Sequence, residues 1–470
     1  MIKLTDLFAA FDTSLSASAD WILSEATVDS RRVLPGSLFF AIKGERVDGH
    51  AYISKAFENG ALVAVIDQDV SCNYPLIDLD KNSSEPIHIP DQPFCIKVKD
   101  SLQAMQTIAA RQRRIINPTV IGITGSVGKS STKELVAEVL GQHFHTHKNP
   151  GNYNNEIGLP LTLINAGYGH DCIVAEMGFY YPGEIRFLCD IAVPHIGIVT
   201  NIGTVHAERA GSQQVIAKGK AELVQSLPED GFAILNYDDP LVRSMNQETR
   251  AAVIYYGLSS DAHLWADDIQ GKGLNGITFD IHHQEHTFHV QVPMLGKHSV
   301  QTILRASAAG LAAGMQWDEI VTGLQKGHSQ LRLVTARAES GALILDDTYN
   351  ATPESMIAAL DLLDELRGHK IAVLGDMLEL GEYEQIGHQQ VGERAAAVVN
   401  HLITVGNLGK IIAASAHQHG LAEKDITTVA DSTQAVQVLK YNLNAEDVVL
   451  IKGSHGLRMD TIASALEKTL

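Results

Sequence analysis

The chain has 470 residues, of which 45% are hydrophobic and 19% are charged, and its formal net charge is −19. This length and composition predict a globular protein of roughly three domains. The acidic balance argues against a nucleic-acid-binding protein, which would present a basic surface, and no apolar run is long enough to span a bilayer. Met1–Leu15 has no secretory signal pattern and the few cysteines lack CxxC spacing, so we expect a cytoplasmic protein.

Residues 1–99 predict a small α/β unit. Apolar runs at Leu38–Ile42 and Ala61–Ile66 predict two strands. We expect a helix between them at His50–Asn59, whereas the polar, proline-punctuated segment Asn73–Pro93 is expected to be a loop.

Polar side chains gather around the first of these strands, at Ser30, Arg31, Lys43 and Asp48. They could hold a pyrophosphate or a uracil. They could equally be turn residues at the strand ends, because polar side chains commonly bond the backbone there. The sequence alone favours neither interpretation.

Residues 100–331 begin with a predicted helix, Ser101–Ile116, and continue into Val120–Thr132, which reads VIGITGSVGKSST. Strand-forming residues, a glycine-rich turn and a helix start follow one another here, which is the pattern of a phosphate-binding loop. In such a loop Lys129 neutralises the outer phosphates, and the Ser130 hydroxyl reaches a metal ion. We predict ATP as the ligand.

Two further predicted strands of this unit end on polar residues. Cys172–Ala175 runs into Glu176, and Ile196–Thr200 runs into Asn201. Ligands of an open parallel sheet bind at the carboxyl ends of its strands. We therefore expect Glu176, Asn201 and the phosphate-binding loop to meet at one edge of the sheet.

Three basic residues come after Asn201 in the sequence. His206 comes shortly after Asn201, and Lys218 and Lys220 lie on a helix predicted over Ser212–Leu227. A carboxylate, an imidazole and the loop hydroxyl suit Mg²⁺ bound together with nucleotide phosphates, because this ion prefers oxygen ligands and keeps several waters. The sequence thus predicts a magnesium site beside the loop.

Two sets of histidines alternate with other residues. A period of two is typical of a strand with one solvent-facing side, and the ligand spacings of metal sites are absent. We therefore interpret these residues as strand residues rather than metal ligands: His143, His145 and His147, and His282, His283, His286 and His289.

Residues 332–470 alternate buried-type strands with helices, which predicts a doubly wound, Rossmann-like unit. It has no G-x-G-x-x-G loop, so the sequence does not support dinucleotide binding. The predicted strands are Ala342–Asp347, Lys370–Asp376, Leu402–Gly406 and Asp447–Gly453, and the predicted helices include Pro353–Leu366, Ile386–Val399 and Ser432–Asn442. Asp347, Asp376 and Lys452 at the strand ends predict a second binding edge that faces the ATP unit.

These segments together resemble the Mur ligase family of peptidoglycan synthesis over nearly the whole chain. The resemblance lies in Asp29–His50, the loop GITGSVGKSST, Gly151–Pro160, Ala175–Gly178, Thr200–Glu208, Asp346–Met356, Leu374–Gly381 and Lys452–Ser454. The family lacks the first glycine of the general phosphate-loop motif, and Ile123 occupies that position here. The last three segments resemble the branch of the family that adds D-alanyl-D-alanine.

The resemblance implies a three-domain α/β fold, with a UDP-substrate domain at 1–99, a central ATP-binding parallel-sheet domain at 100–331 and a Rossmann-like acceptor domain at 332–470. It implies a ligase that joins D-alanyl-D-alanine to UDP-N-acetylmuramoyl-tripeptide through an acyl phosphate, giving the pentapeptide, ADP and phosphate. The expected cofactors are ATP and Mg²⁺. The expected protein is a cytoplasmic monomer that serves cell-wall formation, and through it cell shape and division.

The resemblance also implies roles for single residues. Lys129 would hold the β- and γ-phosphates, Ser130 and Glu176 would hold one Mg²⁺, and His206 and a carbamylated Lys220 would hold a second. The rest of the ATP site would be formed by Gly125, Ser126, Val127, Gly128, Ser131, Asn201, Arg332 and Asp347. The UDP-muramoyl substrate would contact Ser30, Arg31, Asn152 and Asn155, beside the candidates Lys43 and Asp48, and the acceptor would contact Tyr349 and Asn350.

The chain departs from the family pattern at a few positions. Ser299 and Thr302 replace the asparagines of a Gly-x-His-Asn-x-x-Asn motif that is expected near the nucleotide base. Thr352 replaces another asparagine, and His455 replaces an arginine. None of these positions is an expected phosphate or metal residue.

Three other functions compete with this interpretation. A sister ligase of the same family would add a single amino acid instead of the dipeptide. A catalytically silent relative would bind nucleotide for regulation, although Lys129, Ser130, Glu176 and His206 are all intact. A phosphotransferase with the same loop would form no amide, and it would not need the segment Asp29–His50 or the third unit.

Overall fold

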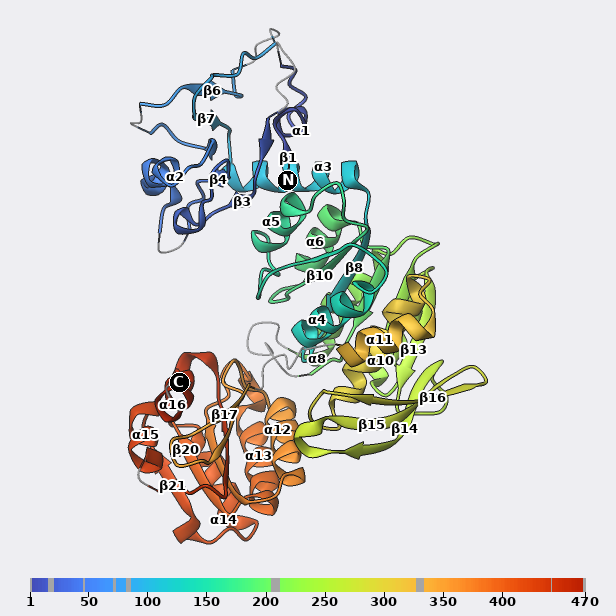
Figure 1. Ribbon diagram of the computed structural model, residues 1–470, viewed down its shortest axis with the longest axis vertical. Helices are drawn as coiled ribbons and strands as arrows, with labels where there is room; N and C mark the ends of the chain where they lie inside the picture. The colour runs from blue at the N-terminus through green and yellow to red at the C-terminus, as the bar shows by residue number, and fades with distance from the viewer. Residues whose placement is uncertain are drawn as a thin grey trace.

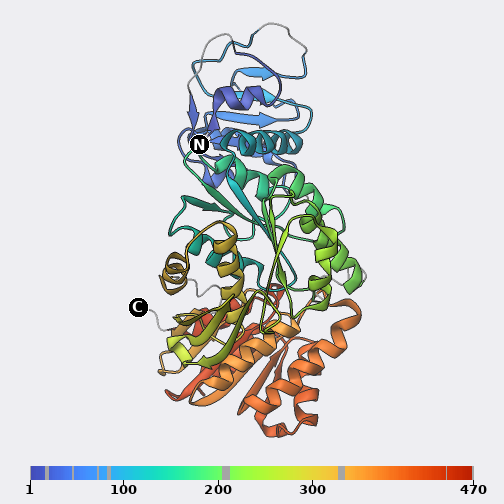
Figure 2. The same cartoon turned by 90° about the vertical axis from the view of Figure 1, so that its right-hand side faces the viewer.

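The computed structural model describes residues 2–15, 21–44, 47–70, 73–81, 86–203, 212–326, 334–440 and 442–467. Over these residues the chain forms three large sheets, of five, nine and six strands, which follow one another along the sequence. Each sheet lies in its own lobe, and the lobes are stacked along the long axis of the molecule (Figure 1, Figure 2). No described helix is long and apolar enough to cross a membrane.

The N-terminal lobe is built on a parallel sheet in the order β3-β4-β5-β7-β6. The two predicted strands are present in shorter form, as β4 (Leu38–Phe40) and β5 (Val63–Ile66). The predicted helix begins as a 3₁₀ turn at Gly49–Tyr52 and continues as α2 (Ile53–Glu58). The prediction of a loop from residue 73 to 93 is wrong at β6 (Leu76–Asp78), whose partly exposed side chains form no apolar run.

The other elements of this lobe are further strands and short helices. They are β1 (Ile2–Lys3) paired with β2 (Ile22–Leu23), α1 (Leu4–Ala9), β3 (Ala26–Thr27), a 3₁₀ turn at Ser30–Arg32 and β7 (Phe94–Lys97). The connection to the central lobe is α3 (Ser101–Ile116), as predicted. Asp100 caps this helix by accepting the Gln103 N–H at 2.8 Å, and the helix ends at Asn117 in the left-handed conformation, with φ 50°.

The central sheet has the order β16-β15-β14-β13-β12-β11-β8-β10-β9 and is parallel except at the β14–β15–β16 end. Its strands are β8 (Thr119–Thr124), β9 (Thr146–Lys148), β10 (Cys172–Glu176), β11 (Ile196–Val199), β12 (Phe232–Asn236), β13 (Ala252–Gly257), β14 (Leu264–Gly271), β15 (Ile277–His283) and β16 (His286–Val292). Alternate residues of β8 enter opposite cores, with Val120 on one face and Ile121 and Ile123 on the other.

Helices cover both faces of this sheet. One core includes residues of α3, α5 (Gly158–Asn165), α6 (Glu184–Ala192) and α8 (Gln213–Gln225). The other includes residues of α4 (Lys129–Leu140), α10 (Ser299–Ala312) and α11 (Trp317–Lys326). A short helix, α9 (Pro240–Arg243), follows β12. The phosphate-loop stretch therefore lies in the middle of the sheet, between the two helical layers.

The later histidine set lies on a strand pair, as predicted. β15 and β16 run antiparallel, and His283 pairs with His286 across the turn. The earlier set is different, because only His147 lies in a strand, β9, while His143 and His145 lie between α4 and β9. Among the described residues no group of three or more His, Cys, Asp or Glu side chains is arranged to hold a metal ion.

The C-terminal sheet has the order β17-β18-β22-β19-β20-β21, and all its pairs are parallel except that of the edge strand β17. Its strands are β17 (Val334–Arg337), β18 (Leu343–Asp346), β19 (His369–Gly375), β20 (His401–Val405), β21 (Ile426–Val429) and β22 (Asp447–Lys452). Its helices are α12 (Pro353–Glu365), α13 (Glu384–Val398), α14 (Gly409–Gln418), α15 (Ser432–Lys440) and α16 (Asp460–Leu466). The predicted doubly wound layout is confirmed, with β17, β21, α14 and α16 added.

The central and C-terminal lobes touch through α12. The β14–β15 turn lies beside this helix (Figure 1), and a Cβ added to Gly271 would lie 1.9 Å from the carboxylate of Glu365. At the other end of α12, a Cβ on Gly203 would lie 3.4 Å from Glu354. The start of α12, which follows β18, therefore lies near the segment that follows β11.

Candidate functional site

The phosphate-binding loop has the predicted strand–loop–helix form. β8 ends at Thr124 and α4 begins at Lys129, so the first backbone N–H groups of α4 point into the loop. Gly128 has φ 84°, a conformation that favours glycine. Gly125 has φ 141°, and a Cβ there would lie only 1.8 Å from Oγ1 of Thr200. The two glycines are thus required by the shape of the loop and by the neighbouring strand end.

The end of β11 holds the loop in place. The Val127 N–H donates to Oδ1 of Asn201 at 2.8 Å, and the Thr200 hydroxyl donates to the Val127 carbonyl at 2.7 Å. The Ser126 N–H donates to the carbonyl of Asn201 at 2.9 Å. Asn201 therefore lies at the predicted edge, and in this structure its side chain braces the loop.

Glu176 lies at the carboxyl end of β10, next to the loop. Its carboxylate is buried and accepts hydrogen bonds from the Ser130 hydroxyl at 2.7 Å and from Nδ2 of Asn154 at 2.9 Å. Nζ of Lys133 is 4.0 Å away. A buried carboxylate oxygen beside a loop hydroxyl offers the hard oxygen ligands that Mg²⁺ takes in nucleotide sites, so the residues present fit the ion.

Two lysines converge on one backbone carbonyl. Nζ of Lys129 donates to the Gly125 carbonyl at 2.7 Å, and Nζ of Lys220 donates to the same oxygen at 2.9 Å. Lys220 is buried against the Phe179 ring, with Nζ 4.9 Å from the ring centre, whereas Lys218 is exposed. Burial, and to a smaller degree the charge of Lys129, hold the pKa of Lys220 well below its usual range.

Two of the three charged strand ends of the C-terminal sheet pair with each other, and the third bonds backbone N–H groups. Nζ of Lys452 lies 2.7 Å from the carboxylate of Asp347 and donates to the Asn350 carbonyl at 2.8 Å. Asp376 accepts the Gly409 N–H at 2.7 Å, at the start of α14. The side chains of Tyr349 and Asn350 are exposed. His206 and Arg332 lie outside the described residues.

In the N-terminal lobe the candidate residues take part in turns. Asp29 accepts the N–H of Arg31 and pairs with its guanidinium at 2.8 Å. Asp48 pairs across a β-bridge with Lys43 and accepts from both the N–H and the ring of His50. The hydrogen bonds to His50 lower the pKa of Asp48 to about 2. Turn bonding is therefore present, and contact with a substrate stays a prediction.

Ser30 of the N-terminal lobe and Asn152 and Asn155 of the central lobe are close in sequence to Arg32 and Tyr153, whose hydrogen bond joins the two lobes. Ser30 is buried, and its carbonyl accepts from Asn59 at 2.8 Å. The Asn155 side chain accepts the N–H of Gly158, the first residue of α5, at 2.9 Å, and Asn152 is exposed. Arg32 donates to the Tyr153 hydroxyl at 2.8 Å and links the two lobes.

Sequence reasoning did not single out Lys133, Asn154 or Arg305. Lys133 is one turn of helix after Lys129, and its Nζ donates to the Gly151 carbonyl at 2.7 Å. Asn154 follows no strand, so the rule of strand ends gave no signal for it. Arg305 lies far along the sequence on α10, yet its side chain reaches the phosphate-binding loop.

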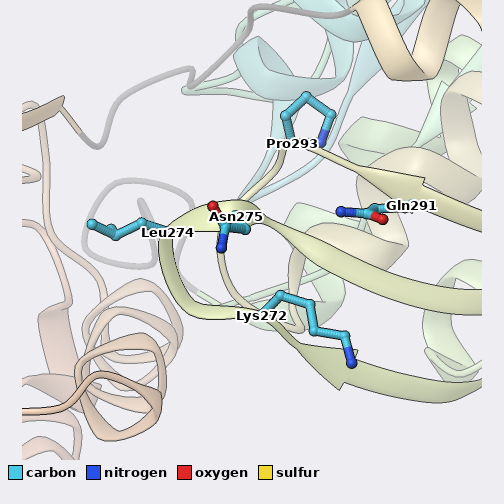
Figure 3. A pocket seen from close by; sticks show the side chains of 5 residues that line it. All are labelled: Lys272, Leu274, Asn275, Gln291 and Pro293. Atoms are coloured by element: carbon cyan, nitrogen blue, oxygen red, sulfur yellow. The ribbon is translucent and has the colours of Figure 1, made fainter.

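A cavity of about 600 Å³ lies away from this site. It is formed at the β14–β15 turn and the end of β16 (Figure 3) and is lined by Lys272, Leu274, Asn275, Gln291 and Pro293. It contains none of the side chains predicted to bind phosphate, metal or substrate. We therefore treat the loop edge, and not this cavity, as the candidate functional site.

Comparison with known proteins agrees with this arrangement. Residues 24–113 match the catalytic domain of the Mur ligase family, residues 123–310 match the Mur ligase middle domain, and residues 331–455 match the Mur ligase glutamate ligase domain. The chain is 34% identical to the UDP-N-acetylmuramoyl-tripeptide–D-alanyl-D-alanine ligase of Bacillus subtilis, over 95% of this chain and 93% of that protein. It is 33% identical to the enzyme of the same name from Escherichia coli, over 96% and 95%.

Solved structures are similar over almost the whole length. A crystal structure of MurF from Acinetobacter baumannii matches with a TM-score of 0.83 at 26% identity, over 99% of this chain and 98% of that one. MurF from Thermotoga maritima in complex with ADP matches with a TM-score of 0.79 at 26% identity, over 95% and 98%. A diaminopimelate ligase matches with a TM-score of only 0.53 at 18% identity, which shows a shared fold alone. With these matches to all three lobes, the chain belongs to the Mur ligase family.

Proposed function

We propose that the chain is the ligase that joins D-alanyl-D-alanine to UDP-N-acetylmuramoyl-tripeptide at the expense of ATP. The observation that carries this proposal is the buried Glu176–Ser130 pair beside a phosphate-binding loop, in a chain that aligns end to end with ligases of that name. Those names favour the dipeptide over a single amino acid as the acceptor. A phosphotransferase or a silent binder is not favoured, because the relatives are ligases over all three lobes.

The reaction requires activation of a carboxylate. An oxygen of the tripeptide carboxylate attacks the γ-phosphorus of ATP, a new P–O bond forms, and the bond to the β-phosphate oxygen breaks to release ADP. The amine of D-alanyl-D-alanine then attacks the acyl carbon, phosphate leaves, and the amine loses a proton. The Lys129 ammonium, which donates to the Gly125 and Ser126 carbonyls of the loop, would contact the β- and γ-phosphates and balance their charge.

The metal sites remain part of the proposal. Ser130 and Glu176 would hold one Mg²⁺, and His206 together with Lys220 would hold a second. When bound, the ions would neutralise charge on the transferred phosphoryl group. The other ATP contacts that we propose are Gly125, Ser126, Val127, Gly128, Ser131, Asn201, Arg332 and Asp347.

Lys220 has the setting that carbamylation needs. A neutral amine attacks the carbon of CO₂, a N–C bond forms and a proton is lost, which turns a cationic side chain into an anionic oxygen ligand. Burial and the nearby Lys129 both favour the neutral amine at Lys220, while Lys218 is exposed and lacks this setting. We therefore assign the carbamate to Lys220.

We propose further that residues 1–99, 100–331 and 332–470 are separate domains and that the protein is a cytoplasmic monomer. The UDP-muramoyl substrate would lie between the first two, near Ser30, Arg31, Lys43, Asp48, Asn152 and Asn155. The dipeptide would lie near Tyr349 and Asn350. Closure of the domains would then exclude water from the acyl phosphate.

The decisive experiment measures phosphate release from ATP with UDP-N-acetylmuramoyl-tripeptide, with and without D-alanyl-D-alanine, and identifies the product by mass. We expect release that depends on the dipeptide, together with a UDP-N-acetylmuramoyl-pentapeptide product. Single amino acids serve as controls. Release with one of them instead would contradict the choice of acceptor, and release with none would contradict the ligase assignment.

A further inference from the structure

Arg305 places a buried guanidinium group against the phosphate-binding loop. The residue lies on α10 and is only 5% exposed. Both of its terminal nitrogens would lie 3.3 Å from a Cβ added to Gly128, so the outer edge of the guanidinium faces the loop where glycine leaves room. Cζ, the central carbon of the guanidinium, lies 5.7 Å from the centre of the Tyr256 ring.

The positive charge of Arg305 is not balanced by an acid in the described part of the chain. Its Nε donates to the Gln301 carbonyl and its Nη2 to the Thr302 hydroxyl, both at 2.9 Å, and both acceptors lie on its own helix. No described carboxylate lies within ion-pair distance of it. Burial lowers the pKa of Arg305, and the neighbouring Tyr256 hydroxyl opposes the shift.

Arg113 shows how a buried arginine is satisfied elsewhere in the same lobe. It is 3% exposed, and its Nε and Nη2 donate to the carbonyls of Ala192 and Val193 at 2.8 and 3.0 Å. These carbonyls end α6, where the helix dipole is negative, and a third bond runs to Oδ1 of Asn117. Arg113 therefore donates to three oxygens, two of them at the negative end of a helix, whereas Arg305 donates to two oxygens of its own helix and faces the positive N-terminus of α4.

A buried cation at the N-terminus of a helix is unfavourable unless an anion joins it. The loop beside Gly128 is shaped to hold phosphate, and a guanidinium binds phosphate oxygens with two donors in a fixed geometry. Lys220 reaches the loop from α8 on one face of the sheet, and Arg305 reaches it from α10 on the other. Cations would then contact a bound polyphosphate from both helical layers.

We infer that Arg305 is a further nucleotide-binding residue, whose guanidinium pairs with a phosphate group of ATP or ADP on the Gly128 side of the loop, and that Thr302 positions it. The inference rests on the proposed phosphate-binding role of residues 125–131. Thr302 takes part because its hydroxyl fixes Nη2, at a position where an asparagine is usual in the family. This arginine would strengthen nucleotide binding without taking part in the acyl-transfer step.

The test compares the affinities of the full chain for ADP and for adenosine by calorimetry. We expect Arg305→Met to weaken ADP binding at least tenfold and to leave adenosine binding unchanged, because adenosine carries no phosphate. Arg305→Lys should lose only a few-fold, and Thr302→Val should lose a few-fold because it frees Nη2. Arg113→Met is the matched control, and it should lower the melting temperature while ADP affinity stays within twofold.

Three results would overturn the inference. Unchanged ADP affinity in a folded Arg305→Met protein would leave Arg305 a structural role, and an equal loss for adenosine would place it on the base or ribose. If Arg305→Met does not fold, unchanged affinity in both Arg305→Lys and Thr302→Val would have the same meaning. Lys129→Ala separates the two proposals, because if it too leaves ADP affinity unchanged, the loop assignment itself fails.

Discussion

At the edge of the central sheet, Glu176 and Lys220 bond groups of the phosphate-binding loop, whereas at the edge of the C-terminal sheet Asp347 and Lys452 pair with each other. Glu176 accepts from the neutral groups of Ser130 and Asn154, and Lys220 donates to a backbone carbonyl. In the C-terminal lobe, Lys452 and Asp347 form an ion pair at 2.7 Å. Both edges have the residue types of a ligand site. At the central edge the nearest ammonium to Glu176 is that of Lys133, 4.0 Å away, while Lys129 and Lys220 donate to a backbone carbonyl, so a charged ligand and metal ions could complete this edge.

The largest effect should come from Lys129. We expect Lys129→Ala to lower kcat/KM for ATP by about 10³-fold, because the ammonium that balances developing phosphate charge is lost. Phosphate release in the presence of both peptide substrates measures the effect. Lys148→Ala is the control, because it removes a lysine of β9 that pairs with Glu134 of α4. If Lys129→Ala kept most of its activity, the central edge would not be the ATP site.

Glu176 tests whether the central edge holds a metal ion. Glu176→Gln keeps the shape of the side chain and removes its charge, so we expect phosphate release to fall about 10²-fold and the Mg²⁺ concentration for half-maximal rate to rise. Glu222→Gln is a suitable control, since that carboxylate binds the N–H groups of Gly183 and Arg186 at the start of α6. An unchanged Mg²⁺ dependence in Glu176→Gln would contradict the metal assignment.

A variant of Asp347 tests the ion pair at the edge of the C-terminal sheet. The variant Asp347→Asn leaves the ammonium of Lys452, which is 3% exposed, without its acid, and we expect a loss of about 2 kcal/mol in the free energy of unfolding. Chemical denaturation measures this loss, and the double variant with Lys452→Met should recover part of it. The KM for ATP of Asp347→Asn shows in addition whether this residue contacts the nucleotide, as we propose.

The same contrast explains how far the sequence could lead. The phosphate-binding loop, α3 and the meeting of Glu176 with the loop were predictable, because strands of high apolar content place their ends at a common edge. The short strand β6 was not predictable, because its side chains are partly exposed and show no period. Arg305 was not predictable either, since its approach to Gly128 depends on the packing of α10 against α4. Pairing between strand ends, as in Asp347 and Lys452, likewise arises only in the folded chain.

His388 should produce the smallest effect, and it tests whether the C-terminal edge is mainly structural. The residue is fully buried on α13, and its Nε2 accepts the Met377 N–H at 3.0 Å, directly after Asp376 at the end of β19. Its Nδ1 donates to the Glu384 carbonyl at 2.7 Å. This bonding needs the neutral ring, and burial lowers the pKa of His388, although the Glu384 hydrogen bond and the charge of Asp376 oppose the shift.

Because the folded protein disfavours protonation of His388, the unfolded chain binds the extra proton first as the pH falls. The contribution of the neutral ring to the free energy of unfolding is therefore fully present above the ordinary histidine pKa of about 6.5. It is lost as the pH falls from there toward the lower pKa of the folded state. We expect the difference in unfolding free energy between the wild type and His388→Gln, measured in denaturant at pH 7.5 and pH 5.5, to shrink at the lower pH. A difference that stays constant would mean that the folded protein protonates His388 as readily as the unfolded chain does. The end of β19 would then hold its shape without a neutral His388, and the contrast between the two edges would rest on the ion pair alone.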